Sequence, residues 1–425
     1  MSPNIPTLHR LSNGMNALLV PHESAESLTF MVFIHVGSRY EEKANNGASH
    51  FLEHLFFKGT DKHPTTLSLS QELDRYGAEY NAYTSKDLTG FYIKIDATKT
   101  TLAIELLHEM LFASKFDPAE IDRERGVIIE EINMYEDNPA ALMDDLLEEV
   151  SFPKNSLGWT IAGPRENIRA MTREQILAHK DRYYIPPRMT LVAAGKLDKG
   201  ILALLEKTFG TVTRPKKRED AAFLPFSGSP VRAPRLKFLH KKTEQVQLGL
   251  SFPGYHVSDP KTPPARLLGL MLGGSMSSRL FTEVRERRGL CYGIHAGHQA
   301  LEDTGIFSIS AGLETKRFGE AVSVIWDELA RMAKDGVEQK ELQDAKDHYR
   351  GKLTLAFEDS STQADWYGKQ WIFRHDTKPP EAWLQKMERV NPRQILSVAQ
   401  ELFQKKFMRA AVVGPFEEKE LKGMF

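Results

Sequence analysis

The 425-residue chain contains one internal repeat, and a duplicated unit of this size limits the folds that it can adopt. The segment Thr-Arg-Glu-Gln-Ile-Leu begins at Thr172, and the segment Asn-Pro-Arg-Gln-Ile-Leu begins at Asn391. In each copy a helical stretch follows, and an apolar strand then ends at a glycine, which is Gly195 or Gly414. The copies are offset by 219 residues. This agreement of residue order and spacing favours a duplication over a chance likeness between two αβ units.

Matching strands also lie near the start of each copy. Residues 28–37 and residues 246–254 both alternate in the way that strands do. Such a duplication predicts an α+β fold with two homologous domains, each an antiparallel sheet with helices packed on it. We expect these domains at residues 1–212 and 236–425.

The segment between the copies, residues 213–235, has the composition of an exposed linker. It combines basic residues, two adjacent acids, several prolines and a Ser-Gly-Ser triplet. A nucleic-acid-binding patch is the alternative, but the neighbouring acids and the lack of aromatics between the basic residues argue against it. The formal net charge of the chain is −1, so no global field attracts nucleic acid or an anionic membrane.

Several features that the sequence lacks bear on the expected cellular compartment. Cys291 is the one cysteine, so neither an intramolecular disulfide nor a cysteine-based zinc site can form. The first residues, 1–11, have no basic region followed by an apolar run, so we expect no signal peptide. The apolar stretches are far shorter than the roughly 18 residues that a membrane span needs. We therefore expect a soluble, cytoplasmic protein.

Residues 47–57 carry the chemistry, because three ionisable residues stand there in an apolar run. His50 and His54 are four positions apart, which places both imidazoles on one face of a helix. Two imidazoles placed in this way can bind one metal ion, and zinc is the usual one. Glu53 is adjacent to His54, and its carboxylate can reach water bound to the metal without being a metal ligand itself. The order His-x-x-Glu-His is a signature of zinc peptidases.

A structural role for these histidines is the alternative, because helical histidines are usually surface residues or satisfied core groups. The apolar context favours the functional interpretation, since burying three unpaired ionisable side chains would be costly.

A catalytic zinc normally has three protein ligands, so one more is needed. Asp117 and Pro118 begin a second predicted helix, which extends to about residue 135. On this helix Glu124 and Glu131 share a face, whereas Glu130 is rotated by about 100° from Glu131. We assign Glu131 as the third ligand and Glu124 as an acceptor that orients a ligand histidine. A solvated acidic helix face is the alternative that spacing leaves open.

The His-x-x-Glu-His motif, followed 77 residues later by Glu131 within residues 124–132, resembles the pitrilysin/insulinase family of zinc metallopeptidases. The likeness covers nearly the whole chain and is greatest to the bacterial branch that resembles mitochondrial processing peptidase. It implies two homologous α+β domains that form a clamshell around a chamber. It also implies zinc ligation by His50, His54 and Glu131, with Glu53 as the general base and Glu124 in support of catalysis.

Two further segments resemble the substrate-binding parts of this family. Residues 77–84, which include Asn81, Ala82 and Tyr83, resemble the segment that leads into a substrate-binding edge strand. Extended peptides add to such an edge through main-chain hydrogen bonds. Residues 273–281, followed by Arg285 and Tyr292, resemble the family's second-domain segment, in which an arginine contacts a substrate carbonyl and a tyrosine stabilises the oxyanion. A surface role for Arg285 within the charged run 283–288 is the alternative.

The second copy of the repeat lacks the metal ligands. At a local offset of 217 residues, the motif falls on Leu267-Leu268-Gly269-Leu270-Met271. We therefore expect one zinc ion per chain.

These observations predict a zinc-dependent endopeptidase that acts on peptides or unfolded polypeptide segments. A non-catalytic subunit of the same fold and a binding module with coincidental histidines are the competing interpretations. We expect a homodimer, although a partner from a second gene stays open, and we expect neither nucleic acid nor a membrane as a partner.

Overall fold

The computed structural model describes residues 5–213, 222–226, 235–421 and 423–425, so most of the expected linker lies outside the described residues. The chain forms two compact units. Unit 1 comprises Met1–Ile132, Thr160–Leu224 and Thr354–Pro379, and unit 2 comprises Asn133–Trp159, Pro225–Leu353 and Pro380–Phe425. Each unit therefore contains one helical segment that comes from the other half of the sequence.

Unit 1 is built on a sheet with the order β1-β2-β6-β3-β5-β4. Its strands are β1 (Thr7–Arg10), β2 (Asn16–Pro21), β3 (Ser27–Ile34), β4 (Glu79–Thr84), β5 (Thr89–Asp96) and β6 (Met189–Gly195). Most neighbours are antiparallel, as expected, but β6 pairs in parallel with β2. The parallel pair arises because β6 inserts between β2 and β3, so it must follow the direction of one of them.

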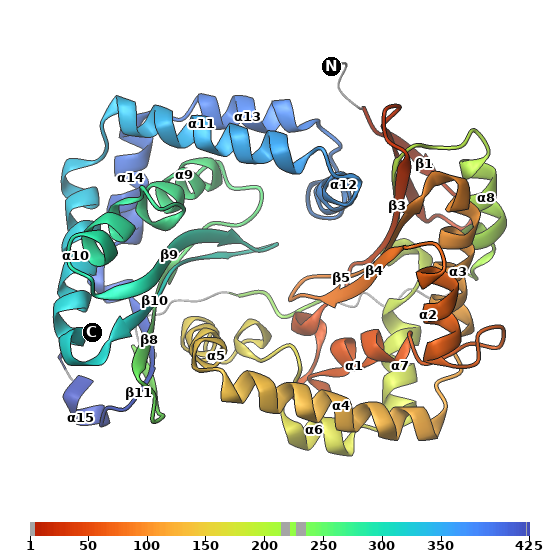
Figure 1. Cartoon of the computed structure of the whole chain (residues 1–425), viewed down its shortest axis with the longest axis horizontal. Helices are drawn as coiled ribbons and strands as arrows, with labels where there is room; N and C mark the ends of the chain where they lie inside the picture. Colours follow the sequence, from red (N-terminus) through yellow and green to blue (C-terminus); the bar gives the residue numbers. More distant parts are fainter. Residues whose placement is uncertain (1–4, 214–221, 227–234, 422) are drawn as a thin grey trace. The chain divides into compact units, whose positions relative to one another are not determined.

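The two faces of this sheet carry separate hydrophobic cores, because successive strand residues point to opposite faces. Along β3, Phe30 and Val32 belong to a large core, whereas Phe33 belongs to a smaller one with Tyr367. Tyr367 lies on α12 (Ser360–Arg374), which packs against β3 in Figure 1. At Gly368 of α12, an added β-carbon would lie 2.1 Å from the Phe33 ring, so only glycine permits this approach.

The large core is covered by helices of the first half of the chain, with α3 packed on β3 and β5. Apart from α5, which belongs to unit 2, the helices of this half are α1 (Ala48–Leu55), α2 (Thr66–Asp74), α3 (Thr100–Ala113), α4 (Pro118–Asp137), α6 (Arg165–Ala170), α7 (Arg173–Tyr183) and α8 (Ile201–Thr208).

Unit 2 repeats the sheet topology in the order β7-β11-β8-β10-β9, which lacks only a counterpart of β1. Its strands are β7 (Leu236–His240), β8 (Gln245–Pro253), β9 (Cys291–Ala300), β10 (Gly305–Glu314) and β11 (Arg409–Gly414). Its helices are α5 (Pro139–Ser151), α9 (Thr262–Gly273), α10 (Phe318–Asp335), α11 (Gln339–Ala356), α13 (Pro380–Glu388), α14 (Pro392–Leu402) and α15 (Glu418–Leu421). Here β11 is parallel to β7 and antiparallel to β8, as β6 is to β2 and β3.

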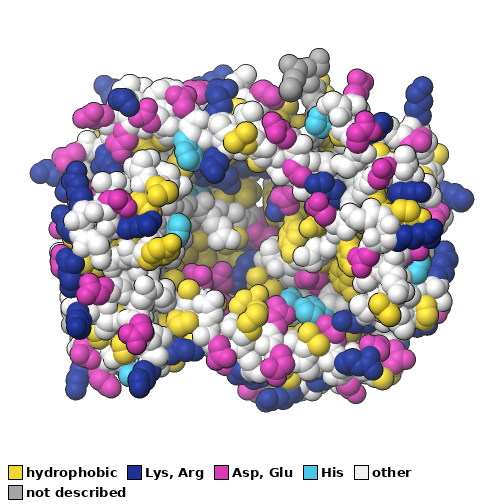
Figure 2. All heavy atoms as spheres, in the orientation of Figure 1, with side chains coloured by type: hydrophobic (Ala, Val, Ile, Leu, Met, Phe, Trp, Pro, Cys, Tyr) yellow, Lys and Arg dark blue, Asp and Glu magenta, His cyan; other side chains and the backbone are white. Residues whose placement is uncertain are grey.

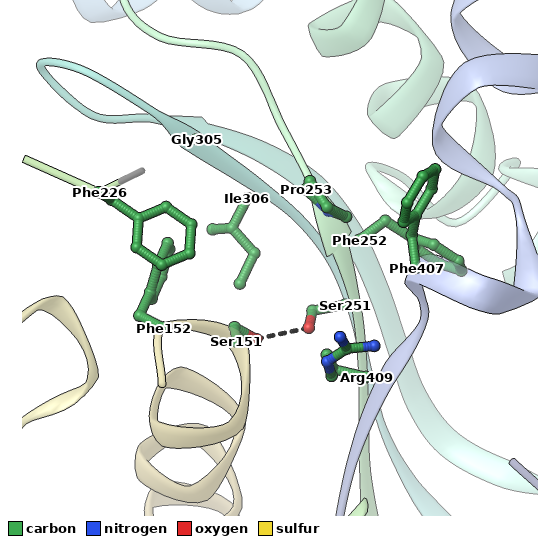
Figure 3. A pocket seen from close by; sticks show the side chains of 10 residues that line it. All are labelled: Ser151, Phe152, Phe226, Ser251, Phe252, Pro253, Gly305, Ile306, Phe407 and Arg409. Atoms are coloured by element: carbon green, nitrogen blue, oxygen red, sulfur yellow. Dashed lines mark hydrogen bonds between the residues drawn. The ribbon is translucent and has the colours of Figure 1, made fainter. Parts of the chain in front are cut away.

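Helix α5 packs on β8 and β11 of unit 2, and α12 packs on unit 1 in the equivalent way. At the end of α5, the hydroxyls of Ser151 and Ser251 are 2.6 Å apart, as the dashed line in Figure 3 marks. A cavity of about 30 Å³ beside them has room for a single water molecule. The cavity is therefore a small packing gap and is too small for a larger ligand.

The two repeated helix starts share the same cap chemistry. Thr172 accepts the backbone N–H of Gln175, whose side chain bonds back to the N–H of Thr172. Asn391 and Gln394 form the same capping box at the start of α14. The α+β class with two similar sheets is thus confirmed, whereas the clamshell and its chamber stay a prediction.

Charged side chains of both signs are interspersed on the face shown in Figure 2, in keeping with the net charge of −1. Among the described residues, no helix combines the length and the apolar character that crossing a bilayer requires.

Candidate metal centre

Helix α1 separates its polar and apolar side chains onto two faces. Phe51, Leu52 and Leu55 are buried in the large core of unit 1. His50, Glu53 and His54 are only partly buried, so they line the other face. The helical spacing in the sequence therefore predicted the direction of all three side chains.

A buried carboxylate holds the start of α1. Glu41 accepts the backbone N–H groups of Gly47 at 2.8 Å and Ser49 at 2.7 Å, and the side-chain amide of Asn46 at 2.9 Å. Gly47 has a φ of +102°, and a β-carbon there would lie 2.7 Å from the carbonyl oxygen of Ala162. Carboxylates at a helix start accept hydrogen bonds from its unpaired N–H groups, and their negative charge interacts favourably with the positive end of the helix dipole. The motif therefore begins from a firmly anchored turn.

Helix α4 brings the carboxylates to α1. The Asp117 side chain accepts the N–H of Ala119 at 2.8 Å, as its predicted cap role requires. Glu124 is buried, Glu131 is partly buried and Glu130 is exposed, in agreement with the predicted phase of the helix. The structure thus brings Glu124 and Glu131 to the histidines of α1.

The three predicted ligands converge on one point. The Nε2 atoms of His50 and His54 are 3.3 Å apart, and the Glu131 Oε2 atom lies 3.6 Å from the first and 3.4 Å from the second. Tetrahedral zinc with ligand distances of about 2.0–2.1 Å separates its ligand atoms by about 3.3–3.4 Å. These are the only three residues among the described ranges whose His, Cys or carboxylate donors cluster in this way. The donor set therefore fits one zinc ion.

His54 is oriented by the carboxylate that the sequence proposed for this role. Its Nδ1 lies 2.8 Å from Glu124 Oε1, and Lys58 Nζ lies 2.6 Å from the other oxygen, Glu124 Oε2. Burial lowers the pKa of His54, but hydrogen bonds to Glu124 and Glu131 outweigh it and raise that pKa to about 9. Burial raises the pKa of Glu124, but hydrogen bonds from His54 and Lys58 outweigh it and lower that pKa. Partners of this kind fix the ring orientation of metal-binding histidines.

His50 is held differently. Burial and the adjacent His54 lower its pKa to about 4, so its imidazole is neutral near pH 7. Its Nδ1 atom is buried and has no hydrogen-bond partner among the described residues. A neutral ring is the form that can donate a lone pair to a metal.

Glu53 lies beside the cluster and is not part of it. Its Oε2 atom accepts the hydroxyl of Thr84 at 2.5 Å. Burial raises the pKa of Glu53, although the Thr84 hydrogen bond opposes this shift. A carboxylate with a raised pKa is better matched to proton transfer near neutral pH.

The segment predicted to bind substrate forms β4, the edge strand of the sheet in unit 1. The Asn81 side chain accepts the backbone N–H of Ala82 at 2.9 Å. The Tyr83 hydroxyl donates to Asp365 of α12 at 2.7 Å, so its ring faces α12. The substrate roles of Asn81, Ala82 and Tyr83 stay predictions, and for Tyr83 the main chain is the part available for them.

Arg285 and Tyr292 both belong to unit 2. The Arg285 guanidinium lies 4.6 Å from the Phe281 ring centroid and 4.9 Å from that of Tyr292. Arg285 stands in a π-helical turn, Phe281–Glu286, and Tyr292 is 79% exposed at the start of β9. The pair is thus formed as a unit, while its contact with substrate stays a prediction.

Sequence reasoning did not identify three residues that support the site. Lys58 lies in the turn after α1, which ends at Leu55, so helical spacing could not have predicted its contact with Glu124. Thr84 ends the strand that was already identified, but its partner across the fold could not be read from spacing. For Glu41, no pattern in the sequence indicated that its carboxylate would cap the start of α1.

Two family models match most of this chain. Residues 17–165 match the model of the insulinase family, peptidase family M16, and residues 170–349 match the model described as the peptidase M16 inactive domain. The match to the inactive domain spans Leu267–Met271, where the metal ligands are absent.

Relatives and solved structures extend over nearly the whole chain. The uncharacterized zinc protease YmxG of Bacillus subtilis is 32% identical, over 94% of this chain and 96% of its own length. An uncharacterized zinc protease of Streptomyces coelicolor is 33% identical, over 96% of this chain and 90% of its own. The crystal structure of a protease from Helicobacter pylori shares the fold, with a TM-score of 0.88 at 21% identity over 97% of this chain and 100% of that one. The chain belongs to the peptidase M16 (insulinase) family.

Proposed function

We propose that this protein is a zinc-dependent endopeptidase that hydrolyses peptides or unfolded polypeptide segments. The observation that carries the proposal is the convergence of His50, His54 and Glu131 at tetrahedral ligand spacing, with Glu53 beside them. The names of the relatives as zinc proteases support it.

His50, His54 and Glu131 would hold the zinc ion. When bound, zinc supplies Lewis-acid chemistry, which makes water a nucleophile near neutral pH and polarises the scissile carbonyl. Glu53 accepts a proton from the attacking water and delivers it to the leaving nitrogen. Glu124 keeps the His54 ring in place, and Lys58 compensates the charge of Glu124.

The substitution Glu53→Gln tests this assignment. It keeps the size of the side chain and removes the basic oxygen, so the zinc content should stay at one ion per chain. Cleavage of a quenched fluorescent peptide should fall by about 10²–10⁴-fold. Retained turnover would refute the role of Glu53. Zinc binding without turnover on any peptide of a library would favour the non-catalytic subunit.

A folded domain and its unfolded counterpart would test the substrate class. We propose that only the unfolded chain is cut, and equal digestion of both would contradict a chamber that excludes folded proteins.

We also propose that Arg285 and Tyr292 contact the substrate, that the protein forms a homodimer and that it is located in the cytoplasm. Sedimentation of the purified chain tests the dimer, and Tyr292→Phe tests the oxyanion role through a lower kcat.

A further inference from the structure

Strand β4 presents its two faces to two different helices. Ala82 packs into the large core that α1 shares, and β4 and α1 are in contact. Tyr83 points to the opposite face, where its hydroxyl bonds to Asp365 of α12. Because side chains alternate along a strand, Thr84 points back to the side of Ala82 and α1.

The position of Thr84 is set by strand pairing. It is the last residue of β4 and lies opposite Thr89 in the antiparallel register with β5. Thr89 is itself fixed, because its hydroxyl donates to the carbonyl of Val36 at 2.9 Å. The Thr84 hydroxyl therefore projects from a well-defined point on the sheet.

From that point the hydroxyl reaches the carboxylate of Glu53. Thr84 Oγ1 donates to Glu53 Oε2 at 2.5 Å, a bond between residues 31 positions apart in the sequence. The other oxygen, Oε1, has no hydrogen-bond partner among the described residues. The bond thus holds one carboxylate oxygen and leaves the second available for a proton.

We propose that Thr84 is a positioning residue for Glu53, and that its hydroxyl holds the carboxylate in the orientation in which Oε1 can accept the proton of the attacking water. This inference rests on the proposed peptidase function. Hydrogen bonds to charged groups are stronger than neutral ones, and a free carboxylate would otherwise sample several rotamers. The cost of losing the bond should therefore appear in kcat.

The pair Thr84→Val and Thr84→Ser isolates the hydroxyl. Valine keeps the β-branched shape and removes the donor, whereas serine keeps the donor. In Thr84→Val we expect kcat to fall about 10- to 100-fold with KM and zinc affinity near those of the wild type. Thr84→Ser should keep kcat within about threefold of the wild type. Thr100→Val is the matched control, because it removes a hydroxyl bond from Thr100 to the carbonyl of Ala97 at the start of α3, and its turnover per folded chain should be unchanged.

Crystal structures of the zinc-loaded variants give a readout that does not depend on activity. Glu53 should occupy one rotamer in the wild type and in Thr84→Ser, and more than one in Thr84→Val. A wild-type kcat in Thr84→Val, an equal loss in Thr84→Ser, or loss of zinc from Thr84→Val would each overturn the inference. If wild-type turnover is zinc-dependent and Thr84→Val matches it, only this inference fails. If the wild type shows no zinc-dependent turnover, the proposed function fails and the inference falls with it.

Discussion

Helices α1 and α9 hold equivalent places in the two halves of the chain. Each follows the central strand of its sheet, β3 before α1 and β8 before α9. On α1 the motif side chains His50, Glu53 and His54 are partly exposed. On α9 the segment Leu267–Met271 is apolar throughout, with Leu267 and Leu268 fully buried.

The difference shows what a metal site requires of this scaffold. Residues of other elements provide partners for the polar face of α1, namely Glu124 and Glu131 from α4 and Thr84 from β4. On α9 the same stretch contributes to the core, which stabilises unit 2 by burial. One copy of the fold thus carries the candidate metal centre, and in the other copy the equivalent helix contributes to the core.

A substitution that gives α1 the apolar character of α9 should have the largest effect on zinc content and peptide cleavage. His50→Leu removes one of the three proposed ligands, and it places at that position the residue found at Leu267. Zinc content should fall close to zero, and peptide cleavage should fall to background. Metal analysis of the dialysed protein measures the first and a quenched peptide measures the second. A variant that keeps stoichiometric zinc would show that His50 is not a ligand.

Two neighbouring glutamates on α4 give the next test. Glu131→Gln should strip zinc, because it replaces a charged ligand by a neutral amide. Glu130→Gln is the matched control, since the exposed Glu130 lies on another face and should keep full zinc content. Metal loss from the Glu130 variant alone would mean that the assignment of helix phase is wrong.

Weakening the hydrogen bond between Glu124 and His54 should have a smaller effect on zinc binding and turnover. Glu124→Gln keeps the shape of the acceptor but weakens its bond to His54 Nδ1. Metal affinity or activity should fall about 10- to 100-fold. Chelator competition and peptide turnover measure these two quantities. Unchanged values for both would mean that Glu124 does not orient the histidine.

The α9 counterpart should have no effect on zinc. Leu267→Ala creates a cavity in unit 2 and should lower the free energy of unfolding by about 2–5 kcal/mol. Zinc content and turnover per folded chain should match the wild type. Denaturant titration gives the stability, and loss of zinc from this variant would contradict the division of roles between the two helices.

Local and periodic features of the fold could be predicted from the sequence. The strands that end at Gly195 and Gly414 and the capping boxes at Thr172 and Asn391 depend on residues close together in the chain. Helix phase predicted that Glu124 and Glu131 share a face of α4, whereas their meeting with the histidines was implied by the family resemblance. These signals are local, so they do not depend on how the elements pack.

Other features depend on packing between distant segments. Helix α12 packs on the sheet of the first half, and α5 packs on the sheet of the second half, although helix periodicity cannot tell which sheet a helix covers. Similarly, Glu41 caps α1 and Thr84 holds Glu53 through side-chain bonds that no spacing rule predicts. The parallel pairs β2–β6 and β7–β11 arise from strand insertion late in each repeat.

Anomalous scattering at the zinc absorption edge, from a crystal of the full-length wild-type chain, addresses the metal centre most directly. We predict one peak per chain, within coordination distance of His50 Nε2, His54 Nε2 and Glu131 Oε2. A zinc-replete protein with its peak elsewhere, or with a second peak at α9, would contradict a single centre built by α1 and α4.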